Sequence, residues 1–389
     1  MDNQKQNAPE ERAVVCTSLI AVDRYVETNI VSNEESISRG RDFVNWGPLN
    51  NFPEYLHKLY KTVTTLRSVI GGCVNYVAGD RVDGRALMAD GKMNRKGDTL
   101  RTIVRKAAKD YELYGGFAFN AIRNNEGKVV EIYNVDMRYL RSNEENTVFY
   151  YSEDWGKRWG KAKDVISPKF VRDLDWSKLE DDARKAMLTS IAYFKGEDSD
   201  GDTYPSCLFE AAIKDCEIER MIEEFHLNDL NNGFAASYVL NILSGGTPPD
   251  DVKEKVEKDV KEKLGGYQNG GRIMLNFAVD KDHMAVAQKL EASNFEERYK
   301  ALAARARQQI YAAFHANPNL FGIPTENLGF SSEEYESAFK LFNRTMITPV
   351  QIMIAEALQS IYDCNLKITP FSLEGNSENA NTATGGASE

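Results

Sequence analysis

The residues IYAAFHANPNLFG, Ile310 to Gly322, join the end of a long amphipathic helix to a loop that carries apolar side chains. Ser293 and Glu296 form a capping box in front of this helix, so the sequence predicts a helix over residues 293–315. Proline and glycine then favour an irregular connection over residues 316–330. The sequence therefore predicts a long helix that is followed directly by an irregular loop with apolar side chains.

A further helix is predicted after this loop. Ser331 and Glu334 form its cap, and the apolar spacing continues to about Ser360. Pro349 lies inside the helix, where it removes one backbone donor and clashes with the carbonyl of the preceding turn. We expect a kink there, and a short strand near residues 366–371 beyond it.

Upstream, a second long helix is predicted over residues 205–230, and it ends at Asn231-Asn232-Gly233. At 1.5 Å per residue it would span roughly 38 Å. Between the two long helices lies a compact insert, in which a strand near 237–243, a helix over 251–264 and a strand near 272–278 predict a small α/β unit. The insert helix alternates Lys with Glu around a narrow apolar stripe. We expect the apolar side to pack against the protein and the charged sides to face solvent or a partner.

Residues 40–195 read as an α+β domain. Asn51-Phe-Pro-Glu54 opens a helical region that Gly79 ends. Asp98 opens the next helix and Gly115-Gly116 closes it, with Arg105, Lys109 and Glu112 expected on its outer face. The period then changes to two, and Asn124–Gly127 predicts a hairpin turn between strands at 117–123 and 128–135.

Composition restricts the class of protein. The chain has 389 residues with 48 Lys and Arg against 59 Asp and Glu, a formal net charge of −11, which excludes a freestanding basic nucleic-acid clamp. No run approaches the roughly 18 apolar residues of a membrane span, and the first residues lack the order of a secretory signal.

Five widely spaced cysteines predict reduced core thiols. Residues 1–39 are expected to form a flexible arm and 373–389 a disordered tail.

The usual signatures of catalysis are absent from the sequence. It holds no phosphate-binding glycine loop, no zinc-protease motif, no nucleophile elbow and no paired CxxC, so we expect no enzyme activity, no cofactor and no metal site. The acidic residues of the 205–230 helix could feed a two-metal nuclease site, although a solvated or channel-facing side is favoured. Two interpretations stay open for the basic residues of the 293–315 helix, as partners for those carboxylates or as DNA-facing groups: Arg298, Lys300, Arg305 and Arg307.

Three segments together resemble the portal, or head-tail connector, proteins of tailed bacteriophages. The first is the helix from Ile218 through Phe225 to Asn232-Gly233, followed by the strand 237–243. The second is KLGGYQNGGRIML, residues 263–275, and the third is Ile310–Gly322 with the helix that contains Thr348-Pro349. The resemblance covers about residues 200–362, and the front part agrees more loosely.

The resemblance implies a domain plan. Residues 40–203 and 331–372 would form an α/β wing, 204–234 and 293–315 a two-helix stem, and 235–292 a small α/β clip. The crown helices of the family have no counterpart, so the crown is expected to be reduced or absent. Residues 316–330 would be the tunnel loop, with candidate channel residues Asn317, Pro318, Asn319, Leu320, Phe321, Glu326 and Asn327.

The resemblance also implies a function and partners. The protein would form a ring of about twelve subunits at one vertex of a virion, assembled in the cytoplasm of the bacterial host, through which double-stranded DNA is packaged and ejected without sequence specificity. Expected partners are the terminase large subunit, the major capsid and scaffold proteins and a head-tail adaptor, with no membrane. Docking of the motor or adaptor is expected at charged clip residues: Lys253, Glu254, Lys255, Glu257, Lys258, Lys261 and Glu262.

Charge fits the same mechanism. About twelve copies of a chain with a net charge of −11 sum to roughly −130, enough to shape the field around a DNA molecule. Mostly acidic walls with a few basic rings let a duplex slide, because strong phosphate contacts would hold it. Two alternatives remain, a head-tail adaptor or minor capsid protein without a channel, and a divalent-metal nuclease that uses the acidic helix.

Overall fold

The structure is a computed structural model, and it describes residues 30–37, 42–155, 165–196, 202–231, 238–243, 248–264, 273–278, 281, 284, 295–322 and 332–372. Two compact units divide the chain. One contains Arg220–Ala303, and the other contains Asn29–Glu219 with Ala304–Glu389. We call them the insert unit and the main unit. The predicted arm at 1–39 lies outside the described residues except for 30–37, and the predicted tail at 373–389 lies wholly outside them.

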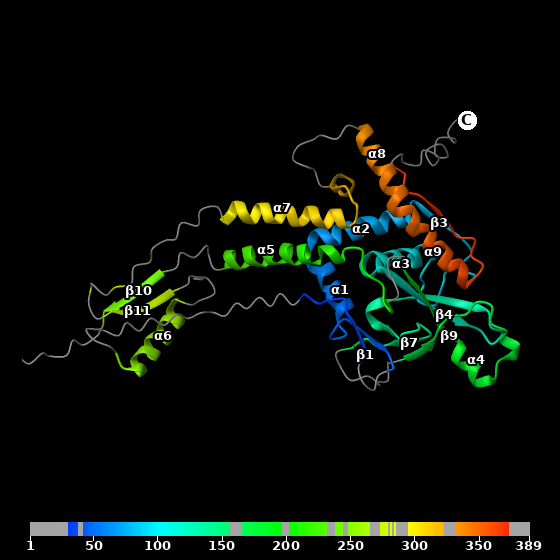
Figure 1. Ribbon diagram of the computed structural model, residues 1–389, viewed down its shortest axis with the longest axis horizontal. Coiled ribbons are helices and arrows are strands. Elements are labelled where there is room, and N and C mark those ends of the chain that lie inside the picture. Colours follow the sequence, from blue (N-terminus) through cyan, green and yellow to red (C-terminus); the bar gives the residue numbers. More distant parts are fainter. Residues whose placement is uncertain are drawn as a thin grey trace, which may run out of the picture. The chain divides into compact units, whose positions relative to one another are not determined.

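The main unit is built on three helices and a three-stranded antiparallel sheet in the order β5-β4-β9 (Figure 1). Alternate residues of the central strand point to the same face, and on one face Phe117, Phe119 and Ala121 are all inaccessible. These elements are α1 (Phe52–Thr62), α2 (Thr64–Ala78), α3 (Leu100–Tyr114), β4 (Gly116–Arg123), β5 (Val129–Val135) and β9 (Thr189–Lys195).

Smaller antiparallel ladders surround this core. One sheet has the order β6-β7-β8, and two pairs, β1-β2 and β3-β12, tie distant parts of the chain together. The β3-β12 pair joins the strand after α2 to the predicted terminal strand. These elements are β1 (Glu35–Ile37), β2 (Val44–Trp46), β3 (Arg81–Asp83), β6 (Leu140–Ser142), β7 (Val148–Tyr151), β8 (Val165–Pro168), α4 (Asp181–Met187) and β12 (Lys367–Thr369).

The predicted hairpin is confirmed. Its turn is held by Asn124, whose side-chain oxygen accepts from the backbone amide of Lys128 at 2.9 Å, and Gly127 takes a positive φ of 82°. The helix before it also ends as predicted, with Gly115 left-handed at φ 79°. It begins one residue later than predicted, because the side chain of Thr99 caps it and Asp98 pairs with Lys106 instead.

One prediction about α3 is wrong. Glu112 was expected on the outer face, yet its side chain is buried, and that burial raises its pKa to about 8. The neighbouring Asp110 is also buried, and its pKa is raised to about 8 by burial and by Asp136, against the hydrogen bond from Asn134. Both acids of α3 therefore carry a proton near neutral pH.

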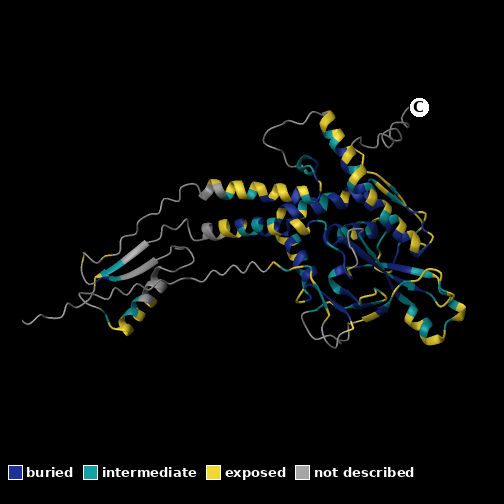
Figure 2. Ribbon diagram, viewed as in Figure 1, coloured by how far each residue is buried: buried dark blue, intermediate teal, exposed yellow. Residues whose placement is uncertain are grey.

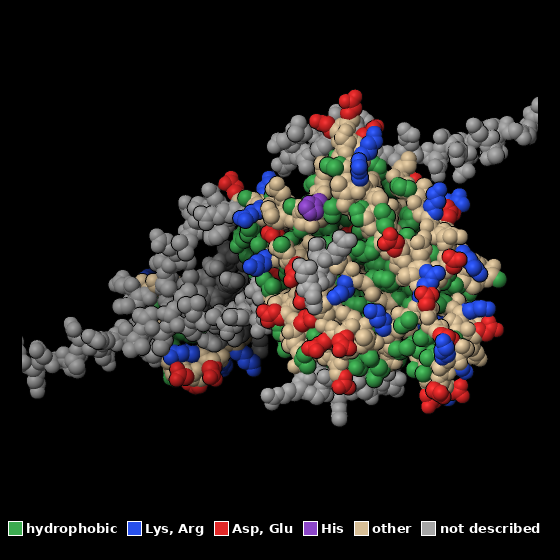
Figure 3. Space-filling model, turned by 45° about the vertical axis from the view of Figure 1, so that its right-hand side comes forward, with side chains coloured by type: hydrophobic (Ala, Val, Ile, Leu, Met, Phe, Trp, Pro, Cys, Tyr) green, Lys and Arg blue, Asp and Glu red, His purple; other side chains and the backbone are tan. Residues whose placement is uncertain are grey.

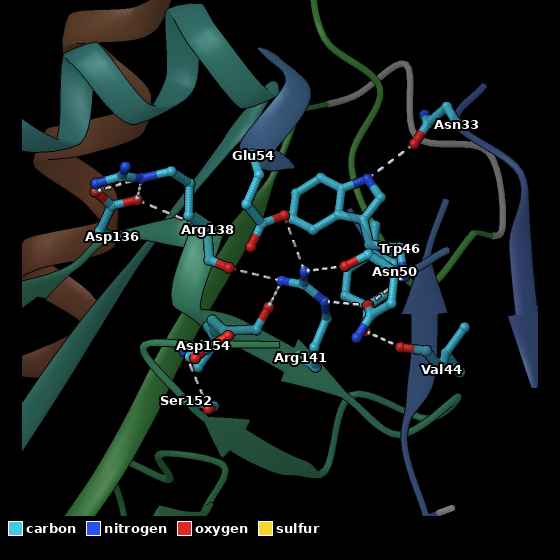
Figure 4. A network of polar contacts seen from close by, with 12 residues as sticks. Asn33, Val44, Trp46, Asn50, Glu54, Asp136, Arg138, Arg141, Ser152 and Asp154 are labelled. Carbon is cyan, nitrogen blue, oxygen red and sulfur yellow. Dashed lines mark hydrogen bonds and ion pairs between the residues drawn. The ribbon is translucent and has the colours of Figure 1, made fainter. Parts of the chain in front are cut away.

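A buried arginine fixes the start of α1 (Figure 4). The guanidinium of Arg141, on β6, donates to the backbone oxygens of Arg138, Leu140 and Asn50 at 2.8, 2.8 and 2.9 Å. Its charge is balanced by Glu54 in the first turn of α1, at 3.5 Å. Because removing one partner would leave a buried charge unpaired, this network fixes the direction of α1.

A π-helical turn lies within the last long helix, just before the predicted kink at Pro349. The helix consists of α8 (Ser332–Phe342), the π turn η6 (Asn343–Ile347) and α9 (Thr348–Ile361), so Pro349 stands in the first turn of α9. The backbone stays helical up to Pro349, with Ile347 and Thr348 in the right-handed region and the backbone amide of Thr348 bonded to the carbonyl of Asn343. The π turn accommodates one extra residue, so the helix is locally wider just before Pro349.

The insert unit contains a β-α-β arrangement as predicted. The strands β10 (Tyr238–Leu243) and β11 (Ile273–Ala278) pair in parallel, with Tyr238 opposite Ile273, and α6 (Asp250–Leu264) connects them. A parallel pair requires a crossover of this kind. The boundary between the two units falls inside the long helices α5 (Ile213–Asn231) and α7 (Phe295–Ala313).

Candidate channel elements

The two long helices pair in antiparallel fashion. Phe209 stacks on Phe314 with ring centroids 5.7 Å apart, Glu219 meets Arg307 at 4.0 Å, and Phe225 contacts Tyr299 at 4.9 Å. Residue numbers thus rise along α5 while they fall along α7. Each helix has 19 residues, or about 28 Å. α5 begins later than predicted, because a 3₁₀ turn, η3 (Glu210–Ala212), precedes it.

Two buried carboxylates attach α5 to the front helices. Glu217 accepts from the hydroxyl of Tyr55 on α1 at 3.0 Å. Glu219 accepts from the hydroxyl and the backbone amide of Thr65, at 2.9 and 3.3 Å. The N-cap residue of α2 is Val63, which has no side-chain oxygen, so Glu219 takes over the role of a cap from another helix.

The acidic residues of α5 divide into groups with different surroundings. Glu217 and Glu219 are buried against the front helices, Glu224 pairs with Arg220 one turn away, and Glu223 is exposed. Among the residues that the structure describes, no group of three His, Cys, Asp or Glu side chains is placed to hold a metal ion. The burial of Glu217 and Glu219 thus explains two of the acidic residues of α5 as contacts to the front helices.

The basic residues of α7 also differ from one another. Arg307 faces the buried Glu219, which fits the ion-pair interpretation. Lys300 and Arg305 are exposed and form no salt bridge within the described part of the chain, while the side chain of Arg298 lies outside it. α7 is exposed over much of its length (Figure 2), and Gln308 and Gln309 add neutral amides to that surface.

The predicted tunnel loop begins with an ordered turn. Asn317 caps the 3₁₀ turn η5 (Pro318–Phe321), and its side chain accepts from the backbone amide of Asn319 at 3.1 Å. Leu320 is buried, and its carbonyl accepts from the hydroxyl of Tyr76 at 2.7 Å. Residues 323–330, with the candidates Glu326 and Asn327, lie outside the described residues.

Phe321 belongs to an aromatic cluster rather than to an open surface. Its ring lies 6.0 Å from Tyr76, 6.0 Å from Tyr311 and 5.9 Å from Phe342. Gly72 on α2 makes this packing possible, because a Cβ there would meet the Phe321 ring. The turn is thus anchored on α2, where Leu320 is buried while Asn317, Pro318, Asn319 and Phe321 are half-buried.

An apolar groove lies beside this turn. It has a volume of about 730 Å³ and lies between the end of α7, η5 and α8. The side chain of Leu341, which lines the groove, is 64% exposed. Its lining includes Ala312, Leu320, Ala338, Leu341, Phe342 and Met346.

Charged residues of α6 were predicted to dock a partner. Glu254, Lys255 and Lys258 are exposed, whereas Lys253 is half-buried and pairs with Asp250 at 2.9 Å. The side chains of Glu257, Lys261 and Glu262 lie outside the described part of the helix. On the face of the molecule drawn in Figure 3, acidic and basic side chains are interspersed, without a continuous basic belt among the residues described there.

Known structures share this fold. A chain in the virion of a native gene transfer agent particle is similar with a TM-score of 0.52 and 15% identity, over 87% of this chain and 86% of that chain. A chain of the native particle's neck, computed with C12 symmetry, has a TM-score of 0.50 and 16% identity, over 82% and 84%. These two matches show a shared fold.

A lower similarity is found to an HK97 family phage portal protein from Corynebacterium diphtheriae, with a TM-score of 0.46, 13% identity and coverage of 80% and 95%. No protein family model matches the chain, and no curated protein matches it. The neck structures were computed with C12 and C6 symmetry. None of the helices in the described part of this chain has the length and hydropathy of a membrane span.

Sequence reasoning missed the residues that hold α5 in place. Glu217 and Glu219 looked like part of a solvated acidic run, and no local pattern marks them as buried. The only available signal is the missing cap at Val63, which leaves the amides at the start of α2 in need of an acceptor. The groove beside η5 had no signal either, since its walls come from three separate segments.

Proposed function

We propose that this protein is the portal of a tailed phage or of a related phage-like particle. About twelve copies form a ring at one vertex of the capsid, and double-stranded DNA passes through its centre during packaging and ejection. The observation that carries the proposal is the antiparallel pair of α5 and α7 flanking a β-α-β module, in a fold that matches chains of symmetric particle necks over more than four-fifths of this chain.

The helix pair would form the stem, the β10-α6-β11 module the clip and the main unit the wing. Lys300 and Arg305 are two exposed basic side chains of α7, and they would face DNA. Arg307 would instead pair with the buried Glu219. Since each chain carries −11, the ring carries roughly −130, which keeps a duplex from settling on the wall. The tunnel loop, 316–330, would project from its anchor at Phe321.

The packaging motor must be a separate protein, because the sequence has no phosphate-binding loop. The terminase large subunit would dock on the exposed charges of α6, with a head-tail adaptor later taking its place, and the major capsid and scaffold proteins would surround the wing. Charges of both signs suit such exchange, because electrostatic complementarity sets partner choice and rate of association more than affinity.

Mass photometry of the full-length protein tests the proposal. We expect a closed species of about twelve 43.8 kDa chains, or roughly 530 kDa. A stable monomer would favour the adaptor or minor capsid alternative and would contradict the proposal. Incubation of the same sample with linear DNA and magnesium should leave the DNA intact, and cleavage that a chelator abolishes would point to the nuclease alternative.

A further inference from the structure

The charged residues of α3 are sorted by sign. Its basic side chains, Arg101, Arg105, Lys106 and Lys109, are all exposed or half-buried, while both acidic side chains, Asp110 and Glu112, are buried. Burial raises the pKa of each of these acids to about 8, so they add little negative charge near neutral pH. The solvent-facing side of α3 is therefore wholly cationic.

Neighbouring helices extend this cationic surface. Lys58 and Lys61 are exposed on α1, and Arg67 is exposed at the start of α2. The ring of Tyr60 lies between two cations, with the Arg67 guanidinium 5.6 Å and the Lys109 ammonium 5.4 Å from its centroid. We call the five cations Lys58, Lys61, Arg67, Arg105 and Lys109 the basic face, and two of them, Arg67 and Lys109, contact the ring of Tyr60.

Two neighbouring acids form their salt bridges with arginines outside the basic face. Asp136 is committed to Arg138 and Glu54 to Arg141. Within the described part of the chain, none of the five cations of the basic face forms a salt bridge. In a chain with a net charge of −11, five such cations on three helices that contact one another are a local reversal of sign.

The charge and spacing of the basic-face side chains indicate which ligand they would bind. Four residues along α3 advance about 6 Å, so Arg105 and Lys109 can reach successive phosphates of a strand. Arg and Lys supply most backbone contacts to DNA, and these carry no sequence information. A protein partner would need an apolar centre to its interface, yet the exposed large apolar residues of the described chain do not include any on α1, α2 or α3.

We propose that the basic face binds the phosphate backbone of duplex DNA. This goes beyond the proposed channel, whose acidic walls let DNA pass, because the basic face would hold DNA in a salt-dependent way. Its affinity does not require a closed ring, so the two proposals can fail separately.

Fluorescence anisotropy with a short fluorescein-labelled duplex, over a series of KCl concentrations, tests the proposal on the full-length protein. The triple variant Lys61→Gln, Arg67→Gln, Lys109→Gln should lower the slope of log affinity against log salt by about 2.7, since each lost phosphate contact removes about 0.9. Binding at low salt should fall at least about tenfold. Tyr60→Phe, which keeps the ring, should leave the slope unchanged.

A matched control removes the same charge elsewhere. Lys128, Lys178 and Lys185 are exposed and lie in surface ion pairs, so Lys128→Gln, Lys178→Gln, Lys185→Gln should keep the wild-type slope. Equal slopes for both triple variants would overturn the proposal. A second result would also overturn the proposal: the basic-face triple variant keeps DNA binding but no longer binds a polyglutamate peptide. That result would indicate that the basic face binds an acidic protein partner. Mass photometry of every variant reports ring formation independently.

Discussion

Glu219 on α5 accepts two hydrogen bonds from Thr65, 154 residues earlier, and so closes the amino-terminal end of α2. The carboxylate satisfies an amide of the first turn and lies at the positive end of the helix dipole. One residue therefore joins a long helix of the candidate channel to the core of the main unit. Because Glu219 is also within 4.0 Å of Arg307 on α7, the same carboxylate links both long helices.

Removing this cap should destabilise the main unit. We expect Glu219→Ala to lower the free energy of unfolding by about 1–3 kcal/mol, because buried donors of Thr65 lose their acceptor. Glu219→Gln keeps an acceptor and should cost less. Urea denaturation of the full-length protein measures both, with the exposed Glu223→Ala on the same helix as the control. Equal effects at 219 and 223 would contradict the capping role.

Two neighbouring glycines of α2 should respond in opposite ways to the same substitution. A Cβ at Gly72 would meet the ring of Phe321, so Gly72→Ala should displace the anchored turn and cost about 1–3 kcal/mol. A Cβ at Gly71 meets nothing within 4 Å, so Gly71→Ala should stabilise by about 0.5–1 kcal/mol through helix propensity. Thermal unfolding compares them, and limited proteolysis between α7 and α8 should be faster in Gly72→Ala alone.

Stability should depend on pH through Glu112. Its folded pKa is raised from 4.5 to about 8, so above about pH 4.5 the unfolded chain releases a proton that the folded chain keeps. Stability from this group is present below pH 4.5 and is lost as the pH rises towards 8. Glu112→Gln should therefore stabilise the protein at pH 8, on the order of 3 kcal/mol, and change little at pH 4.5. The exposed Glu126→Gln is the control, and a pH-independent effect at 112 would rule out this explanation.

The two interpretations of the basic residues on α7 can be separated by a pair of variants. Arg307→Gln removes a partner of the buried Glu219 and should cost about 0.5–1 kcal/mol of unfolding free energy. Arg305→Gln should leave stability unchanged, because Arg305 is exposed and forms no salt bridge within the described residues. Denaturation curves decide between them, and equal losses at 305 and 307 would argue against a special role for Arg307.

Much of the fold could be predicted from local patterns. The hairpin at Asn124–Gly127 and the left-handed Gly115 each depend on a few neighbouring residues, and both were confirmed. Burial of charged side chains was not predictable in this way. Glu112 reads as solvent-facing from its own helix, and only the packing of α3 in the main unit encloses it.

The candidate site shows the same division. Apolar spacing predicted both long helices, but their register emerges only from pairs such as Phe225 with Tyr299, which no local pattern encodes. Phe321 looked like a loop residue available to a channel, whereas three distant rings enclose it. Contacts between segments distant in sequence decide which side chains remain exposed.

Imaging of the purified full-length particles down their symmetry axis tests the central claim most directly. We predict class averages of closed rings with about twelve subunits and an open centre wide enough for a DNA duplex. Particles without a central opening, or chains that remain single at every concentration, would contradict the account.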